Sequence, residues 1–162
     1  MINRIAENAL KRLASQFPVV GITGPRQSGK STLAKMTFPN KQYLSFDDKT
    51  LREIASSNPK DFLLAFPDGA IIDEAQKVPE IFDAVKYYVD SEKSEPGKYI
   101  LTGSSQFKLK ENMSDSLAGR VAFLKLLPFT IEELKSNKIL AKNPYEAMIK
   151  GNYPPLHDVR RN

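Results

Sequence analysis

The sequence of 162 residues contains no cysteine and a single histidine, His157. The absence of cysteine excludes a disulfide scaffold, a zinc site made of thiolates and a cysteine nucleophile. One histidine excludes a metal site built from several imidazoles, and a Ser-His-Asp hydrolase would have to use a residue close to the C-terminal end. We expect His157 to be exposed. The chemistry of this chain therefore has to come from other side chains.

No apolar run approaches the roughly 20 residues that a membrane-spanning helix needs. In the first segment, residues 2–13, charged residues alternate with apolar ones at helical spacing. This pattern predicts an amphipathic helix that packs on the domain, and it does not fit a signal peptide. Hydrophobic residues make up 41% and charged residues 27% of the chain, which is ordinary for a soluble globular protein. We therefore expect a cytoplasmic protein with no membrane segment.

The net charge of +5 is concentrated at the C-terminal end. Residues 135–162 carry a net charge of +4, whereas residues 1–134 carry only +1. A basic end of this kind predicts a solvated surface, and a contact with nucleic acid is the alternative that it leaves open.

Short apolar runs alternate with amphipathic segments along the chain. The apolar runs predict strands at 19–23, 43–46, 70–72, 99–102 and 121–124. Helical patterns lie at about 30–36, 50–56 and 60–66, from about 79 onward, and near 106–118, 130–136 and 144–149. This alternation predicts an α/β fold, with a mostly parallel five-stranded sheet sandwiched by helices. Ligands bind beyond the carboxyl ends of such strands, so we expect a site after the first, third or fourth strand.

The loop after the first strand fits the phosphate-binding pattern G-x-x-x-x-G-K-[ST]. Small residues let backbone N–H groups surround a phosphate, and the helix that follows adds positive potential at its N-terminus. Lys30 would reach the β- and γ-phosphates of a nucleotide, and Ser31 would offer its hydroxyl to Mg²⁺. The predicted nucleotide-binding residues are Gly24, Pro25, Arg26, Gln27, Ser28, Gly29, Lys30, Ser31 and Thr32.

The third strand ends in a second motif, since residues 70–74 read Ala-Ile-Ile-Asp-Glu and resemble a Walker B motif. Asp73 would stand near the Mg²⁺ that Ser31 holds, and Glu74 would orient or deprotonate an attacking water. With a Glu directly after the Asp, the motif resembles that of the P-loop NTPases with an added catalytic Glu, and this resemblance implies an extra strand between the phosphate-loop strand and the Walker B strand. The predicted metal ligands are Ser31 and Asp73.

The substrate class is less sharply defined. Small-molecule kinases use an acid after their second strand, and Asp47 or Asp48 would serve there, so a kinase remains an alternative. The chain contains no Asn-Lys-x-Asp motif for reading guanine. ATP is therefore favoured over GTP.

Four polar residues near other strand ends are further candidates. Thr102 and Ser104 follow the fourth strand, where a polar "sensor one" side chain contacts the γ-phosphate or the water; a simple Gly-Ser turn is the alternative. Gln76 would help to position the water or would simply begin a helix. Arg120, just before the fifth strand, is a candidate arginine finger for its own or a neighbouring subunit, and a structural ion pair is the alternative.

Five stretches of the sequence occur in the order found in one known family, namely Gly24–Leu33, Ile71–Pro79, Leu101–Ser105, Leu117–Val121 and Leu127–Leu134. The chain resembles the bacterial and archaeal AAA-type P-loop ATPases that carry a C-terminal domain of unknown function. By this resemblance, Lys30 and Ser31 bind nucleotide and Mg²⁺, Asp73 holds the metal and Glu74 supports hydrolysis.

The resemblance also implies a domain organisation and a function. Residues 1–134 would form the ATPase core, with helix 1–15 packing on it, and residues 135–162 a basic helical connector toward a C-terminal domain absent from this sequence. We expect a Mg²⁺-dependent ATPase whose catalytic residues are Lys30, Glu74, Ser104 and Arg120, and which acts as a homo-oligomer or on a partner protein. A nucleotide-responsive binding module with little turnover and a DNA-associated ATPase that uses its basic end are the alternatives.

Overall fold

A computed structural model describes residues 2–91, 95–141 and 143–157. Within these residues one sheet contains the strands β1 (Val19–Thr23), β2 (Gln42–Ser45), β3 (Ala70–Asp73), β4 (Tyr99–Thr102) and β5 (Val121–Lys125). The strand order is β2-β3-β4-β1-β5, and every neighbouring pair is parallel. Strand β4 thus lies between β1 and β3. This order confirms the extra strand that the Glu after Asp73 predicts.

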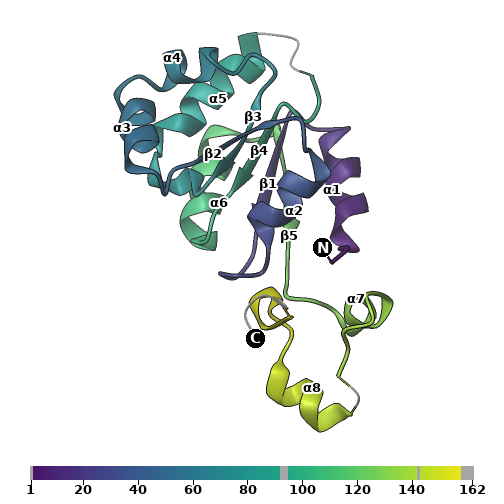
Figure 1. Ribbon diagram of the computed structural model, residues 1–162. Coiled ribbons are helices and arrows are strands. Elements are labelled where there is room, and N and C mark those ends of the chain that lie inside the picture. Colours follow the sequence, from purple (N-terminus) through teal and green to yellow (C-terminus); the bar gives the residue numbers. More distant parts are fainter. Residues whose placement is uncertain (1, 92–94, 142, 158–162) are drawn as a thin grey trace.

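Helices connect the strands and cover both faces of the sheet (Figure 1). They are α1 (Ala6–Ala14), α2 (Lys30–Thr37), α3 (Lys49–Ser57), α4 (Pro59–Leu64), α5 (Glu80–Ser91), α6 (Gln106–Ser116), α7 (Ile131–Ser136) and α8 (Pro144–Lys150), with 3-10 turns η1 (Ala75–Lys77) and η2 (Pro154–His157). Among the described residues, no helix has both the length and the apolar character that crossing a bilayer requires. The predicted α/β fold is confirmed.

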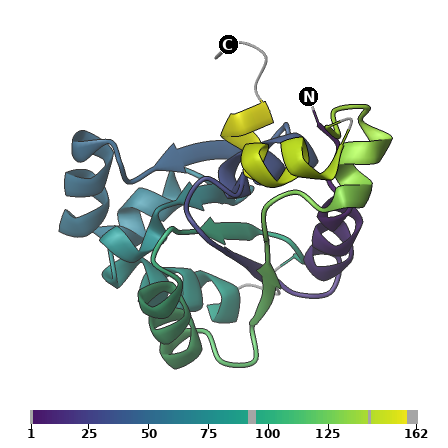
Figure 2. The same ribbon diagram turned by 90° about the horizontal axis from the view of Figure 1, so that it is seen from below.

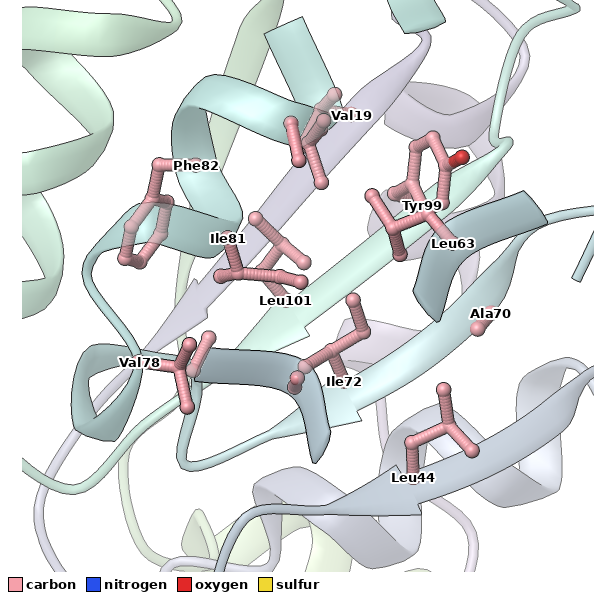
Figure 3. Packing of buried hydrophobic residues seen from close by; sticks show 14 of the residues in the cluster. Val19, Leu44, Leu63, Ala70, Ile72, Val78, Ile81, Phe82, Tyr99 and Leu101 are labelled. Atoms are coloured by element: carbon pink, nitrogen blue, oxygen red, sulfur yellow. The ribbon is translucent and has the colours of Figure 1, made fainter. Parts of the chain in front are cut away.

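Successive residues of the central strands point to opposite faces and build two cores. Toward α3, α4, α5 and α6 point Val19, Ala70, Ile72, Tyr99 and Leu101 (Figure 3). Toward α1 and α2 point Val20, Ile22, Ile71 and Ile100. Because helices cover both faces, each of these strands reads in the sequence as a continuous apolar run.

The carboxyl ends of all five strands meet at one edge of the sheet. The phosphate loop after β1, Glu74 after β3 and Ser104 after β4 therefore come together there. After β5 the chain runs past this edge, and α7, α8 and η2 lie beyond it (Figures 1 and 2). Helix α8 buries none of its own residues.

His157 is buried at the end of η2, where its side chain packs against Phe129. The two rings meet edge to face, with centroids 5.9 Å apart, and His157 Nε2 lies 2.8 Å from the carbonyl oxygen of Gly151. The expectation of an exposed His157 is therefore wrong. The reason is a long-range one, because η2 turns the chain back onto Phe129 and no local pattern indicates that return.

Candidate functional site

The loop between β1 and α2 alternates between left- and right-handed backbone. Gly24, Gln27 and Gly29 have φ angles of 152°, 62° and 91°. A Cβ on Gly24 would collide with the carbonyl oxygen of Leu126, so only glycine fits there. Loops of mixed handedness form concave nests of N–H groups, and the N-terminus of α2 adds positive potential. The loop therefore has the form of an anion cradle.

Lys30 crosses this loop. Its Nζ donates to the carbonyl oxygens of Gly24 and Pro25 at 3.1 and 2.8 Å. Burial lowers the pKa of Lys30, while the nearby carboxylates of Glu74 and Asp73 act in the opposite direction. The ammonium group thus lies inside the loop and faces the two acids that follow β3.

Asp73 ends β3, and three hydroxyl groups hold its buried carboxylate. Ser31 Oγ and Tyr43 OH donate to Oδ2 at 2.9 and 2.6 Å, and Thr102 Oγ1 donates to Oδ1. Burial, together with the hydrogen bond to Asp73 and its charge, raises the pKa of Tyr43 to about 12. Tyr43 is therefore a hydrogen-bond donor throughout the neutral range, and it fixes the orientation of Asp73.

The oxygens of Ser31 and Asp73 fit Mg²⁺. A hydroxyl and a carboxylate 2.9 Å apart are the hard donors that this ion prefers. Mg²⁺ usually keeps several waters and takes one or two carboxylates together with the phosphates of a substrate. In the part of the chain that the structure describes, no group of three or more His, Cys, Asp or Glu side chains could hold a metal. The donor set therefore suits an ion that shares its coordination with a nucleotide.

Glu74 follows with a left-handed backbone, at φ 55° and ψ 38°. Its Oε2 accepts hydrogen bonds from Gln76 Nε2 at 2.5 Å, from Ser104 Oγ at 3.0 Å and from the Ser104 N–H at 3.2 Å. Gln76 packs directly on Gly103, where any Cβ would collide with Gln76 Oε1. The Glu74 carboxylate thus joins the ends of β3 and β4, and the absence of a side chain at position 103 is what allows it.

Lys30, Ser31, Glu74 and Ser104 face one pocket of about 600 Å³, a size that accepts a small-molecule ligand. It is lined by Arg26, Gln27, Gly29, Lys30, Ser31, Thr32, Asp47, Glu74, Lys77, Ser104, Pro154 and Pro155. At its rim Lys77 Nζ pairs with Asp47 Oδ1 at 2.5 Å. The pocket therefore combines residues of the predicted phosphate loop, the end of β3, the end of β4 and the C-terminal segment.

The structure separates the two candidates that follow β4. Ser104 lines the pocket and binds Glu74, whereas Thr102 is fully buried and binds Asp73. Of the two acids considered for a kinase, Asp47 lines the pocket, but Asp48 caps α3 by accepting from the N–H groups of Thr50 and Leu51.

Arg120 lies away from this pocket. Its neighbour Val121 pairs with Val19 at the amino-terminal edge of the sheet, opposite the phosphate loop. The guanidinium donates to both carboxylate oxygens of Asp90, with Nη2 3.0 Å from Oδ2, and these bonds hold the pKa of Asp90 below its usual value. A residue just before a parallel strand lies at the amino-terminal edge of the sheet, whereas the pocket lies at the carboxyl-terminal edge. Within one chain, Arg120 thus forms an ion pair, which is the stated alternative to an arginine finger.

Among the site residues that sequence reasoning missed, Lys77, Pro154 and Pro155 line the pocket, and two others contact the groups around it. Tyr43 reaches Asp73 from β2, and Arg4 donates from Nη1 to the carbonyl oxygen of Ser28 at 2.8 Å. Tyr43 is detectable in hindsight, because β2 pairs with β3 and Tyr43 stands two residues before Ser45, the partner of Asp73, so its long side chain can reach that carboxylate. Arg4 has no local signal, since the two partners lie in different elements.

A family described as "AAA domain" matches residues 16–135. Curated relatives include the uncharacterized proteins Mb2031c of Mycobacterium bovis and Rv2008c of Mycobacterium tuberculosis, each 32% identical over 162 residues. Each match covers 98% of this chain but 35% of the relative. The chain thus spans about a third of the length of these relatives.

Solved structures with the same fold include three nucleotide-binding proteins or domains. The Walker-type ATPase PABY2304 of Pyrococcus abyssi has a TM-score of 0.64 at 19% identity, over 97% of this chain and 66% of that chain. The STAND protein PH0952 of Pyrococcus horikoshii, with a tetratricopeptide repeat sensor, has a TM-score of 0.60 at 18% identity, over 94% and 28%. Domain III of the replication initiation protein DnaA of Thermotoga maritima has a TM-score of 0.55 at 18% identity, over 97% and 82%. At these identities the similarity establishes a common P-loop fold.

Proposed function

The chain belongs to the family of AAA domains, and we propose that it binds ATP with Mg²⁺ and hydrolyses the β–γ phosphate bond to drive or gate a partner. The observation that carries this proposal is the convergence of Lys30, Ser31, Asp73 and Glu74 at one edge of the sheet. Lys30 and Ser31 follow β1, whereas Asp73 and Glu74 lie at the end of β3, and β4 separates these two strands in the sheet. Such a convergence of one cation, one hydroxyl and two carboxylates fits nucleotide chemistry.

The phosphate loop and Lys30 would bind the β- and γ-phosphates. The ammonium of Lys30 already faces the two acids, and among the described residues its hydrogen bonds go to backbone carbonyls of the loop, which a phosphate can replace. Ser31 and Asp73 would hold Mg²⁺, which neutralises charge on the phosphate oxygens when it is bound. Tyr43 and Thr102 would keep Asp73 in the orientation that this requires.

Glu74 would orient the attacking water and accept its proton. The three hydrogen bonds that Glu74 accepts all go to Oε2. We therefore assign Oε1 to the water, because it is the oxygen that these donors leave to other partners. Ser104 and Gln76 would act through Glu74 as positioning residues.

A nucleotide-responsive binding module with little turnover is the second candidate. It is favoured by the hydrogen bonds from Gln76 and Ser104, because in such a module Glu74 would serve to link the ends of β3 and β4 instead of taking a proton from water. In this case ATP binding would change the shape of the chain and gate a partner. The two candidates differ in turnover and share the binding site.

We also propose that the chain divides into a core, residues 1–134, and a basic helical connector, residues 135–162. In α8 the side chains of Tyr145, Met148 and Ile149 are 80%, 80% and 89% exposed. An exposed apolar surface of this kind is typical of a contact with a partner or with another part of a longer polypeptide. Asn152 returns to the core, because its carbonyl oxygen accepts from the Phe129 N–H at 2.9 Å.

The test is steady-state ATP hydrolysis with Mg²⁺, combined with equilibrium ATP binding. We expect Lys30→Ala to weaken ATP binding at least about tenfold, since it removes a charged hydrogen bond. Glu74→Gln should keep ATP affinity and lower turnover about a hundredfold or more. The matched controls are Lys11→Ala and Glu53→Gln, at surface positions on α1 and α3 that should change neither quantity.

The outcomes separate the candidates. ATP binding without turnover in the wild-type protein would favour the binding module. An affinity for ATP that Lys30→Ala leaves unchanged would contradict both candidates, because the phosphate loop would then play no part in binding.

A further inference from the structure

Arg4 connects the phosphate loop to the chain that follows β5. Its three guanidinium nitrogens have three different partners: Nη1 donates to Ser28 O at 2.8 Å, Nη2 to Leu127 O at 2.7 Å and Nε to Glu133 Oε1 at 3.0 Å. The guanidinium carbon also lies 4.7 Å from the centroid of the Phe129 ring. The Arg4 side chain, only 7% exposed, therefore touches both the phosphate loop and the part of the chain after β5. We call this part, residues 126–141 and 143–157, the C-terminal segment.

Glu133 completes this contact from the other side. Its side chain is 3% exposed. Oε1 accepts from Arg4 Nε and from the Ile5 N–H at 2.8 Å, and Oε2 accepts from the Thr130 N–H at 2.9 Å. A buried carboxylate with this many donors fixes the start of α7 against the first residues of the chain. Figure 2 shows α7 beside the N-terminal segment.

The same C-terminal segment forms a wall of the nucleotide pocket. Pro154 and Pro155 line the pocket. They are held in place because Asn152 bonds to Phe129 and because the His157 ring packs on Phe129. At Gly29 the two features meet, since a Cβ built there would lie 3.4 Å from Arg4 Nη1 and 3.7 Å from Pro154 Cγ.

We propose that Arg4 is a positioning residue that couples nucleotide binding at the phosphate loop to docking of residues 126–157, so that each stabilises the other. By holding the Ser28 carbonyl, Arg4 fixes the loop backbone in its cradle form. A nucleotide that contacts both the loop and the proline wall favours the docked segment, and this linkage acts equally in both directions. The inference rests on the proposed ATP binding and adds a route by which ATP acts on the C-terminal segment.

The experiment combines ATP affinity with hydrogen exchange of the backbone amides in residues 127–137 and 151–157, with and without Mg²⁺ and ATP. In the wild-type protein we expect ATP to slow exchange in both stretches about tenfold. In Arg4→Ala, ATP affinity should fall about tenfold and the ATP-dependent protection should disappear. In Arg4→Lys a charge remains without the planar three-way contact, so both effects should be intermediate. Lys11→Ala, on the exposed face of α1, is the matched control and should behave as the wild type.

Two results would overturn the coupling. In the first, the wild-type protein binds ATP but hydrogen exchange in residues 127–137 and 151–157 does not change. In the second, the Arg4→Ala variant binds ATP with the same affinity as the wild type. The first comparison uses wild-type protein alone, so it decides the matter even if Arg4→Ala does not fold. Wild-type protein that does not bind ATP at all would instead refute the proposed function, and the affinity measurement identifies that case directly.

Discussion

Asp73 and Glu74 are each held by side chains that come from other strands and loops. Tyr43, Thr102 and Ser31 hold the first carboxylate, and Ser104 and Gln76 hold the second. At the scale of single residues, these neighbours fix the orientation of both acids, on which the proposed roles toward Mg²⁺ and water depend. Each carboxylate can be tested separately by removing one of its hydrogen-bond donors.

Gln76→Ala removes one of the donors to Glu74. We expect kcat for ATP hydrolysis to fall about tenfold, because a hydrogen bond to a charged group contributes about 1.5 kcal/mol. KM for ATP should change little, since Gln76 does not line the pocket. The control is Gln16→Ala at an exposed loop position. A raised kcat would contradict this prediction and would mean that Gln76 restrains Glu74.

Tyr43→Phe removes the hydroxyl that orients Asp73 while leaving the ring in place. We expect the Mg²⁺ concentration for half-maximal activity to rise about fivefold, which corresponds to the loss of about 1 kcal/mol from one hydrogen bond. A magnesium titration at saturating ATP measures it. Tyr145→Phe is the matched control, since Tyr145 is 80% exposed on α8. Equal titrations for Tyr43→Phe and the wild type would show that Ser31 and Thr102 suffice to hold Asp73.

At the scale of the elements, the sequence predicts the strands and helices well, because the sheet is buried on both faces and its strands are continuous apolar runs. The Glu after Asp73 even predicts the strand order. The loop motif and the acids after β3 are local patterns, and the structure brings them together. Contacts between distant elements, such as Arg4 with Ser28 or Tyr43 with Asp73, escape prediction because each partner looks ordinary in its own segment. The two interpretations of Arg120, arginine finger or ion pair, are not separated by the sequence, because the partner Asp90 lies 30 residues earlier in α5.

Asp48→Ala tests the role of an acid that the sequence left open. Asp48 accepts from the N–H groups of Thr50 and Leu51 at the start of α3. Loss of such a cap costs about 1 kcal/mol, which lowers Tm by about 2–4 °C in a chain of this size. ATP affinity and turnover should not change. Glu53→Ala, an exposed position within α3, serves as the control for thermal unfolding. Lost turnover with an unchanged Tm would instead revive a catalytic acid after the second strand.

At the scale of the whole molecule, the two edges of the sheet differ in character. The carboxyl edge holds the nucleotide pocket, and the amino edge holds the exposed pair of Arg120 and Asp90. Any action of Arg120 on a phosphate would therefore require a second chain. The dependence of the hydrolysis rate on protein concentration distinguishes an Arg120 that acts on a second chain from one that only forms an ion pair.

Arg120→Ala should leave ATP affinity and the hydrolysis rate per chain unchanged in dilute protein, because Arg120 lies opposite its own pocket. The measurement is the rate per chain over a wide range of protein concentration, for the variant and the wild type. Arg12→Ala, an exposed arginine on α1, is the control. A rate that rises with concentration in the wild type and not in Arg120→Ala would place this residue in a neighbour's pocket.

The central position of β1 has a consequence for how the chain is made. The ribosome releases Val19–Thr23 first among the strands, yet this strand lies between β4 and β5, which are released last. The cradle also depends on late residues, because Gly24 packs against Leu126 and Arg4 pairs with Glu133. A nascent chain that ends before β5 therefore contains the whole phosphate-loop sequence but lacks the contacts that hold the loop in its cradle form. On the proposed function, ATP can therefore stabilise the loop only after β5 and the residues up to Glu133 have been made.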